Sequence, residues 1–101
     1  VGVYRAHVFG VAGPFDLIVS SKRAGNLLIE APFDGGNWEI IEVDVDDKGK
    51  RVMDIDIANQ ELAPGIKIKG DGFFSENTLE LDYVITIDGK NNHYKIVATK
   101  R

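Results

Sequence analysis

Hydrophobic and polar residues alternate most regularly between residues 66 and 87. Two alternating runs, 66–74 and 78–87, flank a short polar segment at 75–77, which is typical of a β-hairpin. The second run carries the longest apolar stripe of the chain: Leu79, Leu81, Tyr83, Ile85 and Ile87. Because side chains alternate between the two faces of a strand, this stripe predicts a strand with one buried face.

Two glycines interrupt the apolar face of the first run. Ile66 and Ile68 share a face, and Gly70 and Gly72 continue it without side chains. Glycine within a strand is typical of a bulge, a sharp bend or the close approach of another backbone. Two glycines on one face predict a small sheet that coils tightly onto itself.

The same two-residue period predicts six further strands. They cover residues 1–9, 15–20, 27–31, 38–45, 52–58 and 93–99. Turn-forming residues separate them at 10–14, 21–26, 34–37, 46–49 and 88–90, and the longest connection is 59–65. Ile40 and Ile41 are neighbours, which predicts a β-bulge or a segment covered on both sides. No segment shows a helical period over the roughly 11 residues that a helix prediction needs.

About eight short strands with turns between neighbours predict an all-β chain. A length of 101 residues favours a single domain covering residues 1–101. Sequential antiparallel neighbours favour an up-and-down meander. Closing this meander into a small barrel would remove its exposed edges, and this closed barrel is the fold that we predict.

Composition and charge exclude several classes of function. Twelve lysines and arginines stand against 16 aspartates and glutamates, for a net charge of −4, so the chain lacks the basic surface that binds nucleic acid. There is no cysteine, which excludes disulfides, thiolate metal sites and a cysteine nucleophile. No apolar run approaches the roughly 20 residues of a transmembrane helix. Val1 begins the chain without a visible signal peptide, which we interpret as a trimmed or mature product.

The acidic segment 44–49 resembles the start of an EF-hand calcium loop. It has acids at the first and third positions and a glycine at the sixth. Lys48 stands at the fifth position and Ile55 at the twelfth, where oxygen ligands belong. We therefore expect a charged hairpin tip and no metal site.

Histidines and serines give no catalytic arrangement. His7 and His93 would meet if the first and last strands paired, but two imidazoles without a third ligand do not hold a metal. Ser20, Ser21 and Ser75 lie in turn-like contexts without the strand–turn–helix elbow of a nucleophile. We expect surface histidines, no cofactor and no enzymatic activity.

Charged residues of two neighbouring strands are predicted to face each other. Asp54 and Asp56 would lie opposite Lys67 and Lys69 across the 59–65 connection, and such pairs set register at about 0.2–1 kcal/mol each. The alternative, a paired carboxylate site, would need burial and a raised pKa. Strand alternation places these acids on the outer face, so we expect solvated ion pairs.

Four aromatic residues lie at predicted strand ends, where the mouth of a barrel would be. They are Phe33, Trp38, Phe73 and Phe74. Aromatic side chains at a mouth can line an apolar pocket, and these four are the candidate ligand-binding residues. We favour the alternative, that they fill the core, because a barrel of about eight strands is only just wide enough for its own side chains or one small ligand.

Segments 68–73 (Ile-Lys-Gly-Asp-Gly-Phe) and 77–85 (Asn-Thr-Leu-Glu-Leu-Asp-Tyr-Val-Ile) also form a recurrent pattern. With 16–19, 26–29 and the acidic turn before Val52, the sequence resembles the small lipocalin-like (calycin-like) β-barrel proteins of Bacteroides-type bacteria. That resemblance implies a lipocalin-like barrel without assigned catalytic residues. Members of this group are exported, often as lipid-anchored envelope proteins, although this chain has no cysteine to accept a lipid.

The resemblance implies a non-enzymatic exported protein, located in the periplasm or at the outer membrane or cell surface. Its expected partner is a small apolar or amphipathic molecule, or a lipid, bound at one end of the barrel. The alternative function is a structural or protein-interaction module with a filled core and no ligand, which would act through its outer face or an edge strand.

Overall fold

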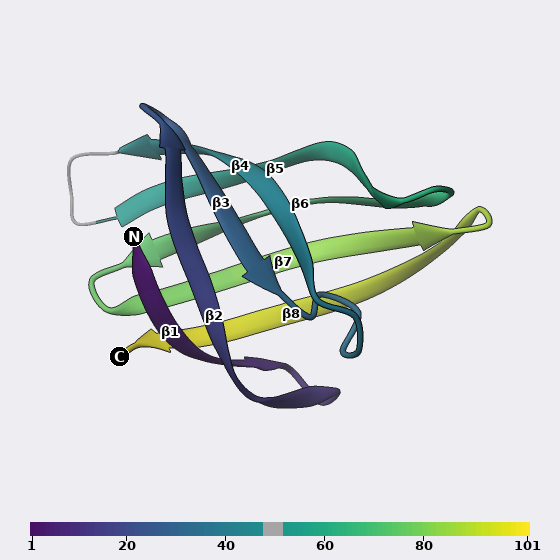
Figure 1. The fold of residues 1–101 in the computed structure, drawn as a ribbon, viewed down its shortest axis with the longest axis horizontal. Coiled ribbons are helices and arrows are strands. Elements are labelled where there is room, and N and C mark those ends of the chain that lie inside the picture. The colour runs from purple at the N-terminus through teal and green to yellow at the C-terminus, as the bar shows by residue number, and fades with distance from the viewer. Residues whose placement is uncertain (48–51) are drawn as a thin grey trace.

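The computed structural model describes residues 1–47 and 52–101, and these residues contain strands and turns but no helix. Eight antiparallel strands follow one another around a barrel, and β1 pairs with β8 to close it (Figure 1). The strands are β1 Gly2–Val8, β2 Ala12–Arg23, β3 Asn26–Ala31, β4 Glu39–Asp47, β5 Val52–Ala63, β6 Ile66–Ser75, β7 Thr78–Ile87 and β8 Lys90–Lys100. The predicted fold class, an antiparallel up-and-down barrel of about eight strands, is confirmed.

Alternate residues of the strands point into the barrel and form its hydrophobic core. In β7, Leu79, Leu81, Tyr83 and Ile85 are fully buried, as the apolar stripe predicts, and Ile87 lies exposed at the end of the strand. Complete burial of one such side chain contributes about 1.5–3 kcal/mol. The core that these residues form is therefore the main source of the stability of the barrel.

Strand β6 approaches β7 closely at its two glycines. A Cβ atom on Gly70 would lie 2.6 Å from the Cα atom of Tyr83 and would also meet the carbonyl oxygen of Asp82. A Cβ atom on Gly72 would lie 2.8 Å from Cδ2 of Leu81. These distances are well inside the roughly 3.5–4.0 Å of carbon–carbon contact, so the interior here has room only for glycine.

Strand β5 is longer than the sequence predicts. It continues to Ala63, so the predicted connection at 59–65 is wrong. The pairing of β5 with β6 shifts twice, between Ile57 and Gln60 and between Glu61 and Ala63. Each β-bulge inserts a residue into the strand, which breaks the period-two pattern and hides the strand from sequence reasoning.

Two other local predictions also differ from the structure. Strand β2 begins at Ala12, so Gly13 and Pro14 belong to a strand and not to a turn. Strand β4 pairs with β3 without a register shift, so the predicted bulge is wrong. Ile40 points outward and is 59% exposed while Ile41 is buried, so the segment is also not covered on both sides.

The connections divide the barrel into two ends. We call the end with both termini and the β6–β7 turn the terminal end, which lies at the left in Figure 1. The opposite end carries the 32–38 loop and the turns at 64–65 and 88–89, and we call it the far end.

Candidate functional site

The four aromatic residues predicted to line a mouth are divided between the two ends of the barrel. Phe33 and Trp38 belong to the loop between β3 and β4 at the far end. Phe73 and Phe74 lie near the end of β6, at the terminal end. The structure therefore does not bring the four together in one site.

At the far end, Phe33 closes the interior. It is fully buried, and its ring meets that of Tyr83 edge-on at a centroid distance of 5.6 Å. The Tyr83 hydroxyl donates a 2.5 Å hydrogen bond to the backbone carbonyl of Phe33, and the Tyr83 ring stacks on Tyr94 at 5.8 Å. Burial, with smaller contributions from Tyr94 and Asp34, raises the pKa of Tyr83. The phenol is therefore neutral and remains a hydrogen-bond donor.

Trp38 lies on the outside of the same loop. Its indole contacts the ring of Phe15 edge-on at 5.7 Å, and 48% of the residue stays exposed. The carboxylate of Asp34 holds the loop by accepting 2.8 Å hydrogen bonds from the backbone N–H groups of Gly36 and Asn37. Burial alone would raise the pKa of Asp34, but these hydrogen bonds outweigh burial and lower it. The loop is thus ordered around an ionised carboxylate.

The two aromatic residues of β6 point in opposite directions. Phe73 pairs with Asp54 and Glu80 on the outer face of the sheet, where it is half-buried. Phe74 points inward and packs against the core, with its ring tilted against Tyr4 at a centroid distance of 6.0 Å. Of these two residues, only Phe74 can therefore face a molecule inside the barrel.

A cavity of about 270 Å³ opens at the terminal end beside Phe74. Its lining is mostly apolar and consists of Val1, Tyr4, Leu27, Val45, Met53, Phe74 and Glu76. Burial raises the pKa of Tyr4, so its hydroxyl is neutral. A concave, mostly apolar site with a few polar groups is the usual form of a small-molecule site.

Of the lining residues, sequence reasoning named Phe74 alone. Tyr4, Leu27, Val45 and Met53 belong to four other strands, and the alternation pattern does give the face on which each lies. Their position at the same end of the barrel follows from strand order and register. Part of that register is not visible in the sequence, because the two bulges in β5 decide that Met53 lies opposite Phe74.

Four aspartates form a row across the outer face of the barrel. The register places Asp44 opposite Asp56, Asp56 opposite Asp71, and Asp71 opposite Asp82. Lys95 ends the row opposite Asp82. Like charges directly opposite each other destabilise a sheet, so this acidic row costs stability.

The predicted pairing of Asp54 and Asp56 with Lys67 and Lys69 is wrong. Lys67 lies opposite Glu61 instead. The hairpin turns at 64–65 and β5 carries two bulges, so the aspartates pair with residues further along β6. The error follows directly from reading 59–65 as a loop.

A groove of about 470 Å³ runs beside the acidic row. Asp56, Asp71 and Asp82 line it together with Lys69 and His93, among others. Within residues 1–47 and 52–101, no three histidine, aspartate or glutamate side chains come together as ligands for a metal ion. The groove is therefore a surface of mixed charge with an acidic excess.

Replacing Asp71 with lysine is expected to stabilise the protein. The change turns two repulsive cross-strand pairs, with Asp56 and Asp82, into attractive ones, and each pair is worth about 0.2–1 kcal/mol. We expect the free energy of unfolding to rise by about 1 kcal/mol in urea denaturation at low salt, and by less at high salt because salt screens exposed charges. Asp71→Asn is the matched control and should give about half the gain. A loss of stability in both variants would contradict the repulsive row.

The two histidines do not meet. Strand β1 does pair with β8, but His7 lies opposite Val97 and His93 lies opposite Val84. Both side chains are exposed, in agreement with the prediction that they are surface histidines.

The segment considered for calcium is described only in part. Asp44 accepts a hydrogen bond from the side-chain amide of Asn26 and faces Asp56 across the strands. Asp46 and Asp47 belong to β4, whereas Lys48 and Gly49 lie outside the described residues. The predicted turn at 46–49 therefore overlaps the end of a strand.

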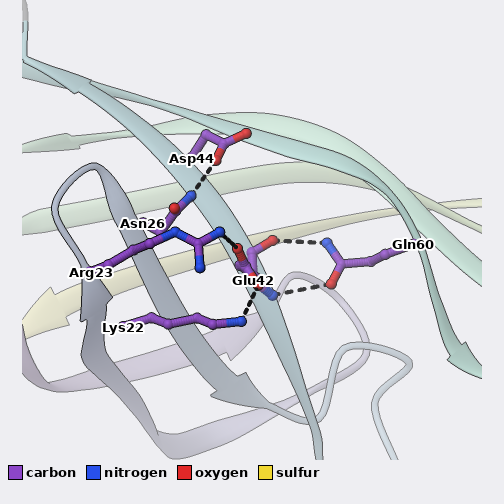
Figure 2. A network of polar contacts seen from close by, with 6 residues as sticks. All are labelled: Lys22, Arg23, Asn26, Glu42, Asp44 and Gln60. Carbon is purple, nitrogen blue, oxygen red and sulfur yellow. Dashed lines mark hydrogen bonds and ion pairs between the residues drawn. The ribbon is translucent and has the colours of Figure 1, made fainter.

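Strands β4 and β5 separate toward the far end. Their pairing stops at Asp44 and Asp56, and the next hydrogen-bonded pair in this register would join Glu42 to Ala58. The side-chain amide of Gln60 reaches across this gap to Glu42 (Figure 2): Oε1 accepts from the N–H of Glu42 at 3.1 Å, and Nε2 donates to the carbonyl of Glu42 at 2.8 Å. Nε2 also donates to the carbonyl of Ala58 at 3.1 Å. A side chain thus takes the place of a strand partner, which no signal in the sequence predicts.

The side chain of Glu42 lies on the outer face of this gap. It forms ion pairs with Lys22 at 2.7 Å and Arg23 at 3.2 Å (Figure 2). The hydrogen bond from Lys22 is the main cause of the lowered pKa of Glu42. These contacts connect β2 to β4 near the point where the pairing of β4 with β5 ends.

No protein-family model, curated protein or solved structure matches the chain. None of the described residues belongs to a helix that could cross a membrane. Among the described residues, the apolar cavity and the gap between β4 and β5 are features that suit a binding function.

Proposed function

We propose that the protein binds a small apolar or amphipathic molecule in the cavity at the terminal end of the barrel and catalyses no reaction. The supporting observation is the apolar cavity of about 270 Å³. This volume lies just below the roughly 300–1,000 Å³ of sites for drug-sized ligands. The ligand is therefore small, such as a short acyl chain or a molecule with one or two aromatic rings.

The side chains of the cavity suit such a ligand. The rings of Tyr4 and Phe74 offer flat apolar surface, and the unbranched side chain of Met53 adapts to irregular shapes. Among the described residues, Glu76 is the one acidic side chain of a lining that is otherwise mostly apolar, so the cavity offers mainly apolar contact. A neutral apolar molecule is accordingly the best probe.

The proposed location is the cell envelope, after export. The support for this location is the sequence resemblance at 68–73 and 77–85, which implies an exported β-barrel protein. In that setting the ligand would be an envelope lipid fragment or another small apolar compound.

Filling the cavity is expected to weaken ligand binding. A neutral fluorescent probe, N-phenyl-1-naphthylamine, should bind the unchanged protein saturably, and Met53→Trp should weaken that binding by about tenfold or more, a change of about 1.4 kcal/mol. Phe73→Ala is the matched control, because Phe73 lies beside the cavity residues in sequence but on the outer face. Fluorescence titration measures both affinities, and thermal melting shows whether each variant is folded.

Two outcomes would contradict the proposal. Binding that survives Met53→Trp but is lost in Phe73→Ala would place the ligand on the outer face. An absence of probe binding, together with no co-purifying small molecule in native mass spectrometry of protein from its source, would favour an interaction module without a ligand.

A further inference from the structure

Strand β4 has an edge that β5 does not cover toward the far end. In an antiparallel ladder the N–H and C=O groups of one residue point to the same side, and alternate residues point to alternate sides. The N–H and C=O of Glu42 point toward β5, since both bond to Gln60. Ile40 is two residues away on a strand without a bulge, so its backbone groups point toward the same gap. The pairing of β4 with β5 ends at Asp44, which is four residues from Ile40 toward the terminal end.

Gln60 shows what this edge recognises. Its amide accepts one hydrogen bond from the backbone of Glu42 and donates another to it. This exchange of two hydrogen bonds is what a residue of an antiparallel partner strand would make. The edge of β4 is therefore competent to bind a peptide group, and in the isolated chain a side chain occupies that position.

The residues around the gap favour a basic partner. The two segments that border it, 39–44 and 56–63, contain no lysine or arginine. They carry five carboxylates: Glu39, Glu42, Asp44, Asp56 and Glu61. Lys22 and Arg23 reach Glu42 from β2, and Lys67 of β6 lies opposite Glu61, which leaves an excess of two negative charges. A second copy would bring the same acidic borders, so charge disfavours pairing of two copies through this edge.

We propose that the edge of β4 at Ile40 and Glu42 binds an extended, basic segment of a partner protein, which pairs with the strand in place of the Gln60 amide. Exposed strand edges bind extended peptides in this way, with main-chain hydrogen bonds giving affinity and side chains giving specificity. Ile40 is exposed on the outer face, so the residue opposite it would be apolar, and residues near Glu42 and Asp44 would be basic. This interaction is independent of the ligand cavity, which lies at the terminal end.

Three synthetic peptides of about eight residues test the proposal. One alternates lysine and valine, the second alternates glutamate and valine, and the third is the lysine–valine peptide with alternate backbone nitrogens methylated. We expect the first to shift the amide NMR signals of Ile40 and Glu42 and to slow hydrogen exchange at Ile40. The acidic peptide should have no effect, because of charge, and the methylated peptide should have none, because it cannot donate to the strand.

A pair of variants at Ile40 and a single variant at Gln60 locate the binding. Ile40→Pro removes the edge N–H without touching the core and should abolish binding, whereas Ile40→Thr keeps the N–H and should retain it. Gln60→Ala removes the competing amide and should tighten binding about fivefold. Thermal melting of each variant controls for folding, and the Ile40 pair decides the matter if Gln60→Ala does not fold.

Several results would overturn the proposal. One is no binding of the lysine–valine peptide, and another is equal binding of the methylated peptide, which would show charge attraction without strand pairing. Signal shifts centred on Asp56, Asp71 and Asp82 would place the peptide on the acidic row instead. Self-association of the unchanged chain that Ile40→Pro abolishes would make the occupant a second copy.

Discussion

Replacing Gly70 with alanine is expected to reduce the free energy of unfolding by about 3 kcal/mol, the upper part of the usual range for overpacking. The added Cβ atom would lie 2.6 Å from Cα of Tyr83 and against the carbonyl oxygen of Asp82. These are backbone atoms that cannot rotate away, so β6 and β7 would have to separate and weaken the hydrogen bonds between them. Urea denaturation followed by circular dichroism measures the loss.

Gly36→Ala is the matched control for this substitution. A Cβ atom at Gly36 would have its nearest neighbour at 3.7 Å, the Asp34 carboxylate, which is ordinary contact. We expect no loss of stability, or a gain of about 0.4–1 kcal/mol, because alanine restricts the unfolded chain. Equal losses of unfolding free energy in the two variants would show that the effect comes from the conformational freedom of glycine and not from the close packing of β6 on β7.

The hairpin of β6 and β7 is the part of the fold that the sequence predicts best. A short polar turn fixes the pairing of the two strands locally, and a long apolar stripe fixes which face is buried. The role of Gly70 also follows from the sequence, because a glycine on the apolar face removes a side chain where the interior is narrowest. Local pattern and global fold agree here, so reasoning from residue alternation is sufficient.

The second half of β5 shows where this reasoning fails. Between Ile57 and Ala63 two bulges change the side to which successive residues point, so the segment has no regular period. A bulge is a response to the curvature of the closed barrel, and that curvature is a property of all the strands together. The Asp56–Asp71 pair, which joins the acidic row across β5 and β6, is not predictable from the sequence for the same reason, since it exists only in the shifted register.

The candidate sites were predictable to different degrees. Phe74 was named because it is an aromatic residue at a strand end, and the structure places it at the cavity. Its predicted companion Phe33 was named on the same grounds but lies at the other end of the barrel. Gln60 gave no signal at all, because a glutamine in an apparent loop is ordinary and its role depends on the separation of β4 from β5.

In β6, destabilising repulsion between aspartates on the outer face coexists with close packing at the glycines on the inner face. Asp71 faces two other aspartates on the outside of the sheet, while Gly70 and Gly72 flank it on the inside. Close packing of β6 on β7 at the glycines supports the register that the turn sets, and this register places Asp71 opposite Asp82. The bulges of β5 place Asp56 opposite Asp71. The repulsion is therefore a consequence of the strand registers, which the packing of the interior is strong enough to maintain.

Replacing Phe33 with alanine is expected to reduce the free energy of unfolding by about 3–5 kcal/mol, the usual cost of removing a buried phenylalanine ring. The ring is fully buried and packs edge-on against Tyr83. The hydrogen bond from the Tyr83 hydroxyl goes to the backbone of Phe33, so its acceptor remains and the loss measures packing. Tyr83→Phe removes only that bond and should cost about 1–3 kcal/mol, because a buried carbonyl loses its donor.

Trp38→Ala is the control on the same loop, and comparing it with Phe33→Ala shows whether Phe33 closes the far end of the barrel. Trp38 is 48% exposed and touches Phe15 at the surface, so its loss should cost about 1 kcal/mol or less. Urea denaturation measures both losses in the free energy of unfolding. A large loss for Phe33→Ala with a small one for Trp38→Ala would show that the Phe33 ring closes the far end, which leaves the terminal end for ligand entry. Similar small losses would mean that the far end is loosely closed, and the barrel would then have two possible mouths.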